Sequence, residues 1–268
     1  MEISVLGSLA CNIHGESVVP VAQKPRKVLA LLAVRANCVV RISELVQELW
    51  DEQPPRSVKV TLQSYIAKIR RGLAGPGASR GKNPLVTRHG GYLLEIPDDW
   101  IDLRRFETLL PQGRQARREG DDERASRLLR SALSLWRGPV LLDIDAGHLL
   151  QSHITRISDA RLEAVEQLME TELRLGRHLD IVGELSEIVA ANPYHENLHA
   201  LLMVALYRSS RCWQALQIFD RLRTTLAQEL GIDPSPKLQR LHSALLNGDP
   251  TLEDPAPRQG LLLDSFAA

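Results

Sequence analysis

The sequence predicts a mainly α-helical protein in which a small α+β region precedes an all-helical region with a tetratricopeptide-like pattern. Strand-like runs flank three helical segments before residue 97. Helical periodicity dominates from Asp102 onward. Pro97-Asp98-Asp99 lies between the two regions and is typical of a domain boundary.

The first region opens with two short β-like runs, Ile3–Leu6 and Val18–Val21, around a polar turn near Asn12–Glu16. A buried helix is expected over Lys27–Val34, because apolar side chains recur there at helical spacing. Val39-Val40 is expected to be a short extended link.

A second helix is expected to begin with Ser43 as its capping residue, with Leu45 to Trp50 supplying its apolar face. Gln53-Pro54-Pro55 ends it, and a third helix follows from about Arg56 to Leu73. A basic loop rich in Gly and Ser then leads to a hairpin over Leu85–Ile96, which turns at His89-Gly90-Gly91. Strands, three helices and a trailing hairpin together predict a winged helix-turn-helix over residues 1–97.

Residues 102–249 are expected to form an all-helical domain, and residues 250–268 a flexible, Pro-rich tail. Glycines and Asn192-Pro193 separate the helical segments at intervals that suggest paired helices of about 34 residues per unit, as in a tetratricopeptide stack. The expected helices lie near 103–119, 122–136, 147–176, 178–191, 195–208, 211–230 and 235–246.

The net charge of zero conceals two regions of opposite sign. Residues 1–97 hold 13 Lys and Arg against 7 Asp and Glu, whereas residues 98–268 hold 20 against 26. Between Glu52 and Glu95 there are eight basic residues and no acidic one. A basic stretch of this kind favours a polyanionic partner, and it makes a self-neutralised surface less plausible.

The third helix is predicted to be the recognition helix, because its outward face carries small side chains, an amide and cations. Gln63 can pair with adenine edges, and Arg70 and Arg71 are placed for phosphates. The alternative without a DNA contact is an ordinary amphipathic helix with a solvated cationic face, although solvated faces normally carry both positive and negative charges. The predicted core side is Val58, Leu62, Tyr65, Ile66, Ile69 and Leu73. The predicted DNA contacts are Lys59, Thr61, Gln63, Ser64, Lys68, Arg70 and Arg71 on the helix, with Arg88 and His89 at the hairpin tip.

Motifs for other chemistry are incomplete, so we expect neither an enzyme nor a cofactor. His195 and His199 fit the spacing H-E-x-x-H, but no third protein ligand for a catalytic zinc follows at the usual spacing. The loop at Gly75–Asn83 has Pro76 where a phosphate loop needs its first glycine and Asn83 where it needs Ser or Thr.

Three well-separated cysteines favour free thiols in a reducing cytoplasm, and the first residues lack the basic start of a signal peptide. No apolar run approaches the ~20 residues of a membrane span. We therefore expect a cytoplasmic protein.

Motifs in both regions resemble one known family. Arg88-His89-Gly90-Gly91-Tyr92 is similar to the R-x-x-G-Y signature of OmpR-type winged helices, and residues 62–73, LQSYIAKIRRGL, resemble the Streptomyces antibiotic regulatory proteins more closely. Asp102-Leu103, Leu135-Trp136-Arg137-Gly138 and residues 229–236, ELGIDPSP, resemble the bacterial transcriptional activation domain of that family. The resemblance covers about residues 1–249.

The resemblance implies a transcriptional activator of a secondary-metabolite, or antibiotic, gene cluster, associated with the nucleoid. It implies that copies bind direct repeats in double-stranded promoter DNA, head to tail, and recruit the RNA polymerase holoenzyme including its sigma factor. The alternative from a different class is an interaction scaffold, in which the helical repeats bind a ligand and the winged helix docks a protein. Strong salt dependence of DNA binding would distinguish the two.

Overall fold

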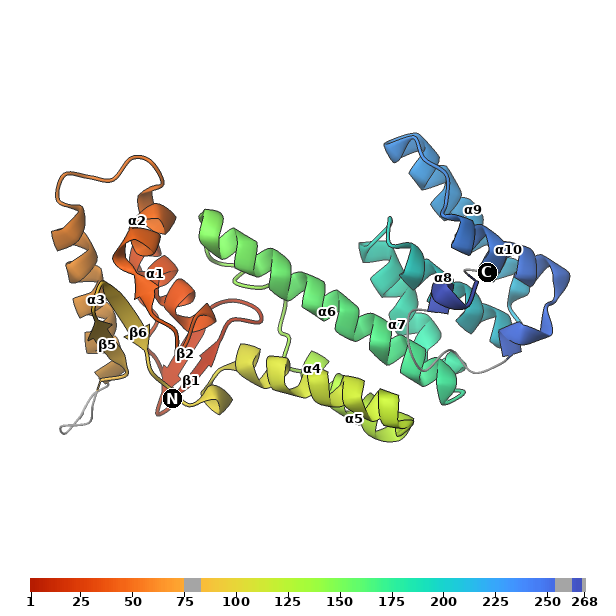
Figure 1. Cartoon of the computed structure of the whole chain (residues 1–268), viewed down its shortest axis with the longest axis horizontal. Coiled ribbons are helices and arrows are strands. Elements are labelled where there is room, and N and C mark those ends of the chain that lie inside the picture. The colour runs from red at the N-terminus through yellow and green to blue at the C-terminus, as the bar shows by residue number, and fades with distance from the viewer. Residues whose placement is uncertain (75–82, 254–261, 267–268) are drawn as a thin grey trace. The chain divides into compact units, whose positions relative to one another are not determined.

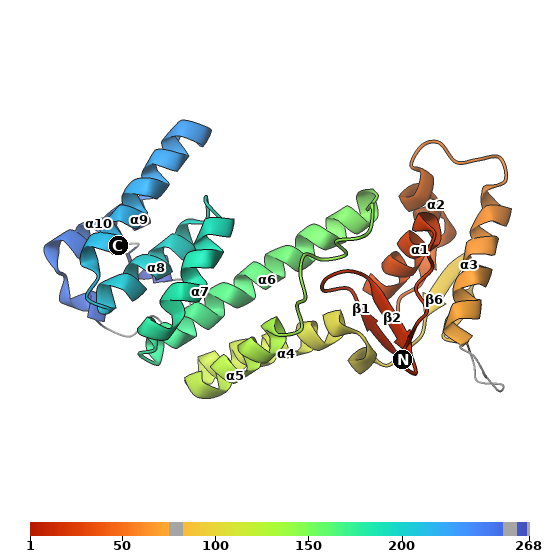
Figure 2. The ribbon, with the colours of Figure 1, turned by 180° about the vertical axis from the view of Figure 1, so that it is seen from behind.

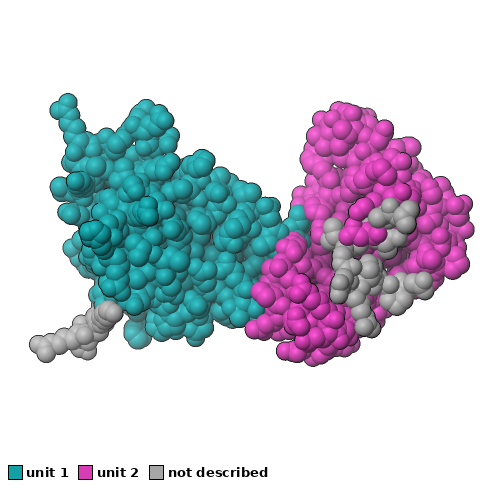
Figure 3. Space-filling model, in the orientation of Figure 1, with its two compact units in different colours: residues 1–109, 132–162 teal, residues 110–131, 163–268 magenta. Residues whose placement is uncertain are grey.

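The computed structural model describes residues 1–74, 83–253 and 262–266, and the chain divides into two compact units (Figures 1 and 3). Unit 1 comprises residues 1–109 and 132–162, and unit 2 comprises residues 110–131 and 163–268. Short strands lie in the first part of unit 1, and the rest of the described chain is mostly helical. This is the predicted fold class.

The N-terminal sheet has three antiparallel strands in the order β1 (Glu2–Ser4), β2 (Ala10–Ile13) and β3 (Glu16–Ser17). The prediction of a strand at Val18–Val21 is wrong. His14 and Gly15 both adopt positive φ, so the chain reverses over two residues, and Asn12 and Ile13 pair with Ser17 and Glu16.

Three helices follow, namely α1 (Gln23–Val34), α2 (Ile42–Trp50) and α3 (Val58–Ala74). The expected cap at Ser43 is wrong, because α2 begins at Ile42 with Arg41 as its capping residue. The Glu44 carboxylate accepts the Arg41 backbone N–H at 2.7 Å, which satisfies a donor at this helix start. The third helix begins two residues later than the predicted Arg56 and ends one residue after Leu73.

The wing sheet has the strand order β4-β6-β5, formed by β4 (Val40–Arg41), β5 (Leu85–Arg88) and β6 (Gly91–Leu94). The predicted hairpin is therefore present, and the expected link at Val39-Val40 contributes a third strand. A Cβ on Gly91 would lie 2.2 Å from the Val40 carbonyl oxygen, so only glycine allows β4 and β6 to pair here. Figures 1 and 2 both show α1, α3 and β6 side by side.

Unit 1 extends beyond residue 97 because two buried carboxylates join its N-terminal residues to segments after residue 97. Each carboxylate accepts backbone N–H groups. Asp102, the first residue of α4 (Asp102–Glu119), accepts the N–H groups of Val5 and Leu6 at 2.8 to 3.0 Å. Glu48 accepts those of Gly147, Leu149 and Leu150 at 2.6 to 3.1 Å, which caps the start of α6 (His148–Arg174). The predicted division at residues 97 and 102 stays a prediction, because this unit continues across it.

Helix α5 (Asp122–Leu133) ends three residues earlier than predicted. Trp136 packs edge-on against Phe106 at 5.3 Å between ring centroids, and the Arg137 N–H donates to the Leu6 carbonyl at 2.8 Å. Because Trp136 and Arg137 make these contacts within unit 1, the helix ends at Leu133.

Unit 2 contains antiparallel helices around α8 (Glu196–Arg208), in which residues 197–206 are all buried. Its neighbours are α7 (His178–Ala191), α9 (Cys212–Thr225) and α10 (Pro236–Asn247), and a π-helical turn, η2 (Leu226–Leu230), follows α9. A flexible tail over residues 250–268 stays a prediction. Its described parts form two 3₁₀ helices, η3 (Pro250–Glu253) and η4 (Leu262–Phe266), in which Leu252 and Leu262 are buried.

No helix in the described part of the chain is long and apolar enough to cross a membrane.

Candidate nucleic-acid interface

Helix α3 has the two faces that its sequence predicts. The buried side chains come from the predicted core side and include Leu62, Ile66, Ile69 and Leu73. Val58 and Tyr65 are half-buried, and α3 packs against α1. The exposed residues form a continuous outward face of Lys59, Val60, Gln63, Ser64, Ala67, Lys68 and Arg71.

The outward face carries positive charge that nothing neutralises locally. Lys59, Lys68 and Arg71 have no ion-pair partner among the described residues. Ser64 donates its hydroxyl to the Thr61 carbonyl at 2.7 Å, so it stays close to the helix surface. Small residues between free cations permit close approach of the helix to a major groove.

The side of α3 that faces the protein is fixed by an aromatic stack. Trp50 at the end of α2 stacks on Tyr65 with ring centroids 6.2 Å apart and planes at 17°. The Lys24 ammonium lies over the Trp50 ring at 4.8 Å. The orientation of α3 therefore depends on both preceding helices.

Arg70 contacts the wing, although the sequence suggested a phosphate contact. Its Nε donates to the Leu85 carbonyl at 2.9 Å, and its Nη2 donates to Thr87 Oγ1 at 2.7 Å. Its guanidinium also lies 5.9 Å from the Tyr92 ring centroid. The half-buried Arg70 thus joins α3 to the wing, whereas its neighbour Arg71 is exposed. A DNA contact by Arg70 stays a prediction.

The wing tip presents the exposed residues Arg88 and His89. Gly90 adopts φ +77° at the second position of the two-residue turn, a conformation that glycine takes without strain. Arg88 lies 3.9 Å from the Glu95 carboxylate, and an exposed ion pair of this length holds the guanidinium only weakly. Arg80 and Lys82 lie outside the described residues.

Two further arginines lie beside the wing tip, and the sequence pattern did not single them out. A hollow of about 690 Å³ is lined by Arg35, Val39, Arg41, Glu44, His89 and Gly90. Arg35 is paired with Glu44 at 2.5 Å, but Arg41 is exposed. Arg41 therefore extends the basic surface of the wing toward the start of α2. It precedes the acid-free stretch in the sequence, so its proximity depends on β4 pairing with β6.

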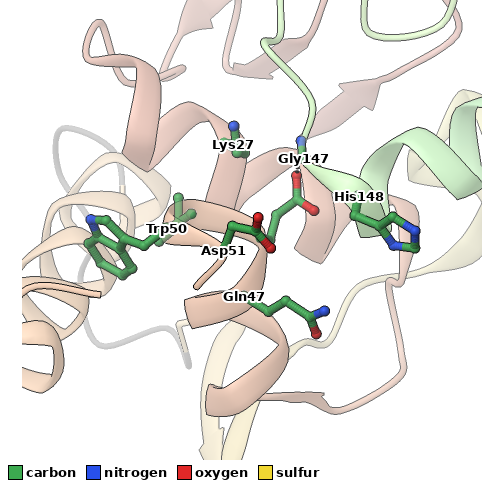
Figure 4. A pocket seen from close by; sticks show the side chains of 8 residues that line it. Lys27, Gln47, Trp50, Asp51, Gly147 and His148 are labelled. Atoms are coloured by element: carbon green, nitrogen blue, oxygen red, sulfur yellow. Dashed lines mark hydrogen bonds between the residues drawn. The ribbon is translucent and has the colours of Figure 1, made fainter. Parts of the chain in front are cut away.

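A second hollow, of about 490 Å³, lies where α2 meets the start of α6 (Figure 4). Its wall mixes charges from Lys27, Asp51 and His148. The backbone N–H of Gly147 is already bound by Glu48. This hollow therefore lacks the uniform positive charge of the α3 face.

The residues of the H-E-x-x-H string make ordinary contacts in unit 2. His195 Nε2 lies 2.9 Å from Glu166 Oε1, and His199 Nδ1 lies 3.0 Å from the His195 carbonyl. The described residues contain no group of three or more His, Cys, Asp or Glu that could hold a metal ion. Gly75 to Lys82 of the other rejected motif lie outside the described residues.

All three cysteines are free, and burial raises the pKa of the Cys11 thiol to about 11. Such a thiol is poorly nucleophilic at neutral pH.

Two family models match the two kinds of structure in this chain. The bacterial transcriptional activator domain matches residues 101–246, and the C-terminal domain of transcriptional regulatory proteins matches residues 15–94. Regulatory protein DnrI of Streptomyces peucetius is 45% identical over 261 residues, which are 96% of each chain. The chain belongs to the Streptomyces antibiotic regulatory protein family. It is a DNA-binding transcriptional activator with an OmpR-type winged helix.

Longer members of this family share the same arrangement. Regulatory protein AfsR of Streptomyces coelicolor is 35% identical over 95% of this chain, which corresponds to 25% of its own length. A structure of EmbR of Mycobacterium tuberculosis, in complex with a low-affinity phosphopeptide, matches with a TM-score of 0.87 and 34% identity. That match covers 99% of this chain and 69% of the EmbR chain. These matched proteins are regulators rather than enzymes.

Proposed function

We propose that this chain activates a secondary-metabolite gene cluster by binding direct repeats in its promoters and recruiting RNA polymerase. The observation that carries the proposal is the outward face of α3, whose cations have no acidic partner among the described residues. A face of this kind attracts phosphates over its whole length, and its small residues and amide can read base edges. The family to which the chain belongs supports the step from DNA binding to activation.

The residues divide by the part of DNA that they would contact. Gln63 and Lys68 lie in the middle turns of α3, on its exposed face, and are assigned to base edges in the major groove. Lys59 and Arg71 are assigned to phosphates on either side, with Thr61 and Ser64 beside them. Arg88 and His89 of the wing, together with Arg41, are assigned to the backbone or to a neighbouring minor groove.

Direct repeats imply that copies bind head to tail, since a palindrome would instead require two-fold symmetry. The residues after 97 carry an acidic surplus, which disfavours a second DNA contact and suits contact with neighbouring copies or with polymerase holoenzyme and its sigma factor. The proposed location is the cytoplasm, at the nucleoid.

The test is a band shift on promoter DNA of the cluster, titrated with salt, with Gln63→Ala and Lys68→Ala. Lys68→Ala should weaken binding and reduce discrimination at one base pair by about 1–3 kcal/mol, as the loss of a base-edge contact does. Gln63→Ala should leave the slope unchanged and reduce discrimination at one base pair by about 1–3 kcal/mol.

Arg127→Ala is the matched control, because Arg127 is an exposed cation on α5 in unit 2. It should bind with the affinity and salt slope of the parent. If both α3 variants also bind like the parent at every salt concentration, the groove assignment is wrong. Weak salt dependence of the parent itself would favour a protein-docking winged helix. Footprinting on the same promoters would show whether the protected sites are direct repeats.

A further inference from the structure

The C-terminal segment of unit 2 is bound to a buried carboxylate. The backbone N–H of Leu262, the first residue of η4, donates to Glu170 Oε1 at 2.9 Å. Glu170 lies on α6 and is only 1% exposed, and its other oxygen accepts Arg117 Nη2 at 2.7 Å. A buried carboxylate needs its lone pairs satisfied, so the Leu262 N–H completes a site that Arg117 fills only in part.

The rest of η4 is held by polar contacts with α10. Lys237 Nζ lies 2.6 Å from the Asp264 carboxylate, and Arg240 Nε donates to the Phe266 carbonyl at 2.5 Å. The Leu262 side chain is 4% exposed, so it supplies the apolar anchor. Three points therefore recognise the segment: a buried leucine with its N–H, an acid two residues later, and a carbonyl two residues after that.

The start of α8 lies beside the start of α10 and carries a buried amide that has no hydrogen-bond partner among the described residues. The Glu196 carboxylate accepts the Ser235 N–H at 2.9 Å, which places the start of α8 beside the start of α10. His195 binds Glu166, which lies one helical turn before Glu170. Asn197 is 5% exposed, and neither atom of its amide has a hydrogen-bond partner in the described structure. A buried amide left in this state retains the capacity to bind a peptide group.

The segment η4 follows η3 in the sequence, and η3 is itself bound to unit 2. Arg208 binds the Leu252 carbonyl at 2.7 Å, which fixes η3, and eight residues separate η3 from η4 in the sequence. Because η4 belongs to the same chain as its binding site, it binds intramolecularly and competes with any peptide supplied in solution. The segment has one buried anchor, Leu262, and its contacts with Lys237 and Arg240 are exposed, so it can detach by local opening.

We propose that α6, α8 and α10 form a peptide-binding site, which the chain's own Leu262–Phe266 occupies in cis and which takes a peptide of the same chemistry in trans. That chemistry is a leucine followed two positions later by an acidic residue. The inference does not rest on DNA binding, since every contact in it lies within unit 2.

The test uses the full chain with a protease site inserted between Pro255 and Arg258, cleaved after folding. A fluorescent peptide of residues 258–268 is then titrated, and its anisotropy is measured. We expect saturable binding to the cleaved protein once its own fragment has been washed away. Binding to the intact chain should be at least tenfold weaker, because the tethered segment competes.

Changes in the peptide cannot unfold the protein, so they keep the test independent of folding. A Leu262→Asp peptide should bind at least tenfold more weakly than the parent peptide. An Asp264→Lys peptide should also lose affinity, and Lys237→Glu in the protein should restore it. Absence of saturable binding to the cleaved protein would overturn the proposal. Equal binding of the parent and Leu262→Asp peptides, or of a scrambled peptide, would overturn it too.

Discussion

Buried carboxylates stabilise each of the two compact units, but the hydrogen-bond donors that they accept differ. In unit 1, Glu48 and Asp102 accept backbone N–H groups from segments about 100 residues away in sequence. In unit 2, Glu172 accepts the side chains of Ser126, Arg130 and Arg177, and Glu170 accepts Arg117 together with the Leu262 N–H. Backbone donors fix the position of a particular stretch of chain, whereas arginine partners are side chains that neutralise the buried carboxylate. The backbone contacts of unit 1 therefore fix the positions of chain segments around the DNA-binding region. The arginine contacts of unit 2 neutralise buried carboxylates in the helical region.

Breaking the Arg117–Glu170 pair should give the largest effect. Arg117→Met leaves Glu170 buried without its cation, which should lower the free energy of unfolding by about 3–5 kcal/mol. Adding Glu170→Gln should recover part of this loss, because the double variant buries no unpaired charge. Chemical denaturation of the two variants and the parent measures both steps. If the double variant is no more stable than Arg117→Met, the pair does not act as a buried ion pair.

Removal of the Glu48 carboxylate should give the next largest effect. Glu48→Ala leaves three backbone N–H groups at the start of α6 without their acceptor, at a cost of roughly 2–3 kcal/mol. The same measurement on Gln47→Ala, an exposed neighbour on α2, should show a change within about 0.5 kcal/mol. DNA affinity of the folded fraction should fall little, since Glu48 lies away from the outward face of α3. Equal stability of the two variants would contradict the capping role.

Unit 2 contains a histidine, His195, whose contribution to the stability of the fold depends on pH. The hydrogen bond with Glu166 raises the pKa of His195 above its ordinary value, although partial burial opposes this. The pair therefore stabilises the fold fully below the ordinary histidine pKa of about 6.5, and this contribution is lost as pH rises through the raised folded value. His195→Gln should be less stable than the parent at pH 5.5, by under about 1 kcal/mol, and nearly equal to it at pH 8.5. A difference in melting temperature that is the same at both pH values would contradict this.

Features that depend on local sequence could be predicted, whereas contacts between distant segments could not. The two faces of α3, the wing hairpin and the helices of the repeat region follow from local periodicity and turn residues, and these predictions are confirmed. Arg41 beside the wing, and the Glu48 and Asp102 contacts, join segments that lie far apart in sequence. Nothing in the spacing of those residues reveals a partner 50 to 100 positions away. The strand predicted at Val18–Val21 is wrong for a local reason, because the chain turns at His14 and Gly15 and pairs Ile13 with Glu16.

Two neighbouring arginines offer the smallest but most discriminating effect. Arg70 is held by Leu85, Thr87 and Tyr92, whereas Arg71 is exposed. Arg71→Gln should therefore reduce the salt slope of DNA binding by roughly 1 and leave thermal stability unchanged. Arg70→Gln should lower stability by about 1 kcal/mol, because it removes contacts between α3 and the wing, and should keep the parent salt slope. The reverse result would place Arg70 on the phosphates, as the sequence alone predicts, and would mean that its contacts with the wing open when DNA binds.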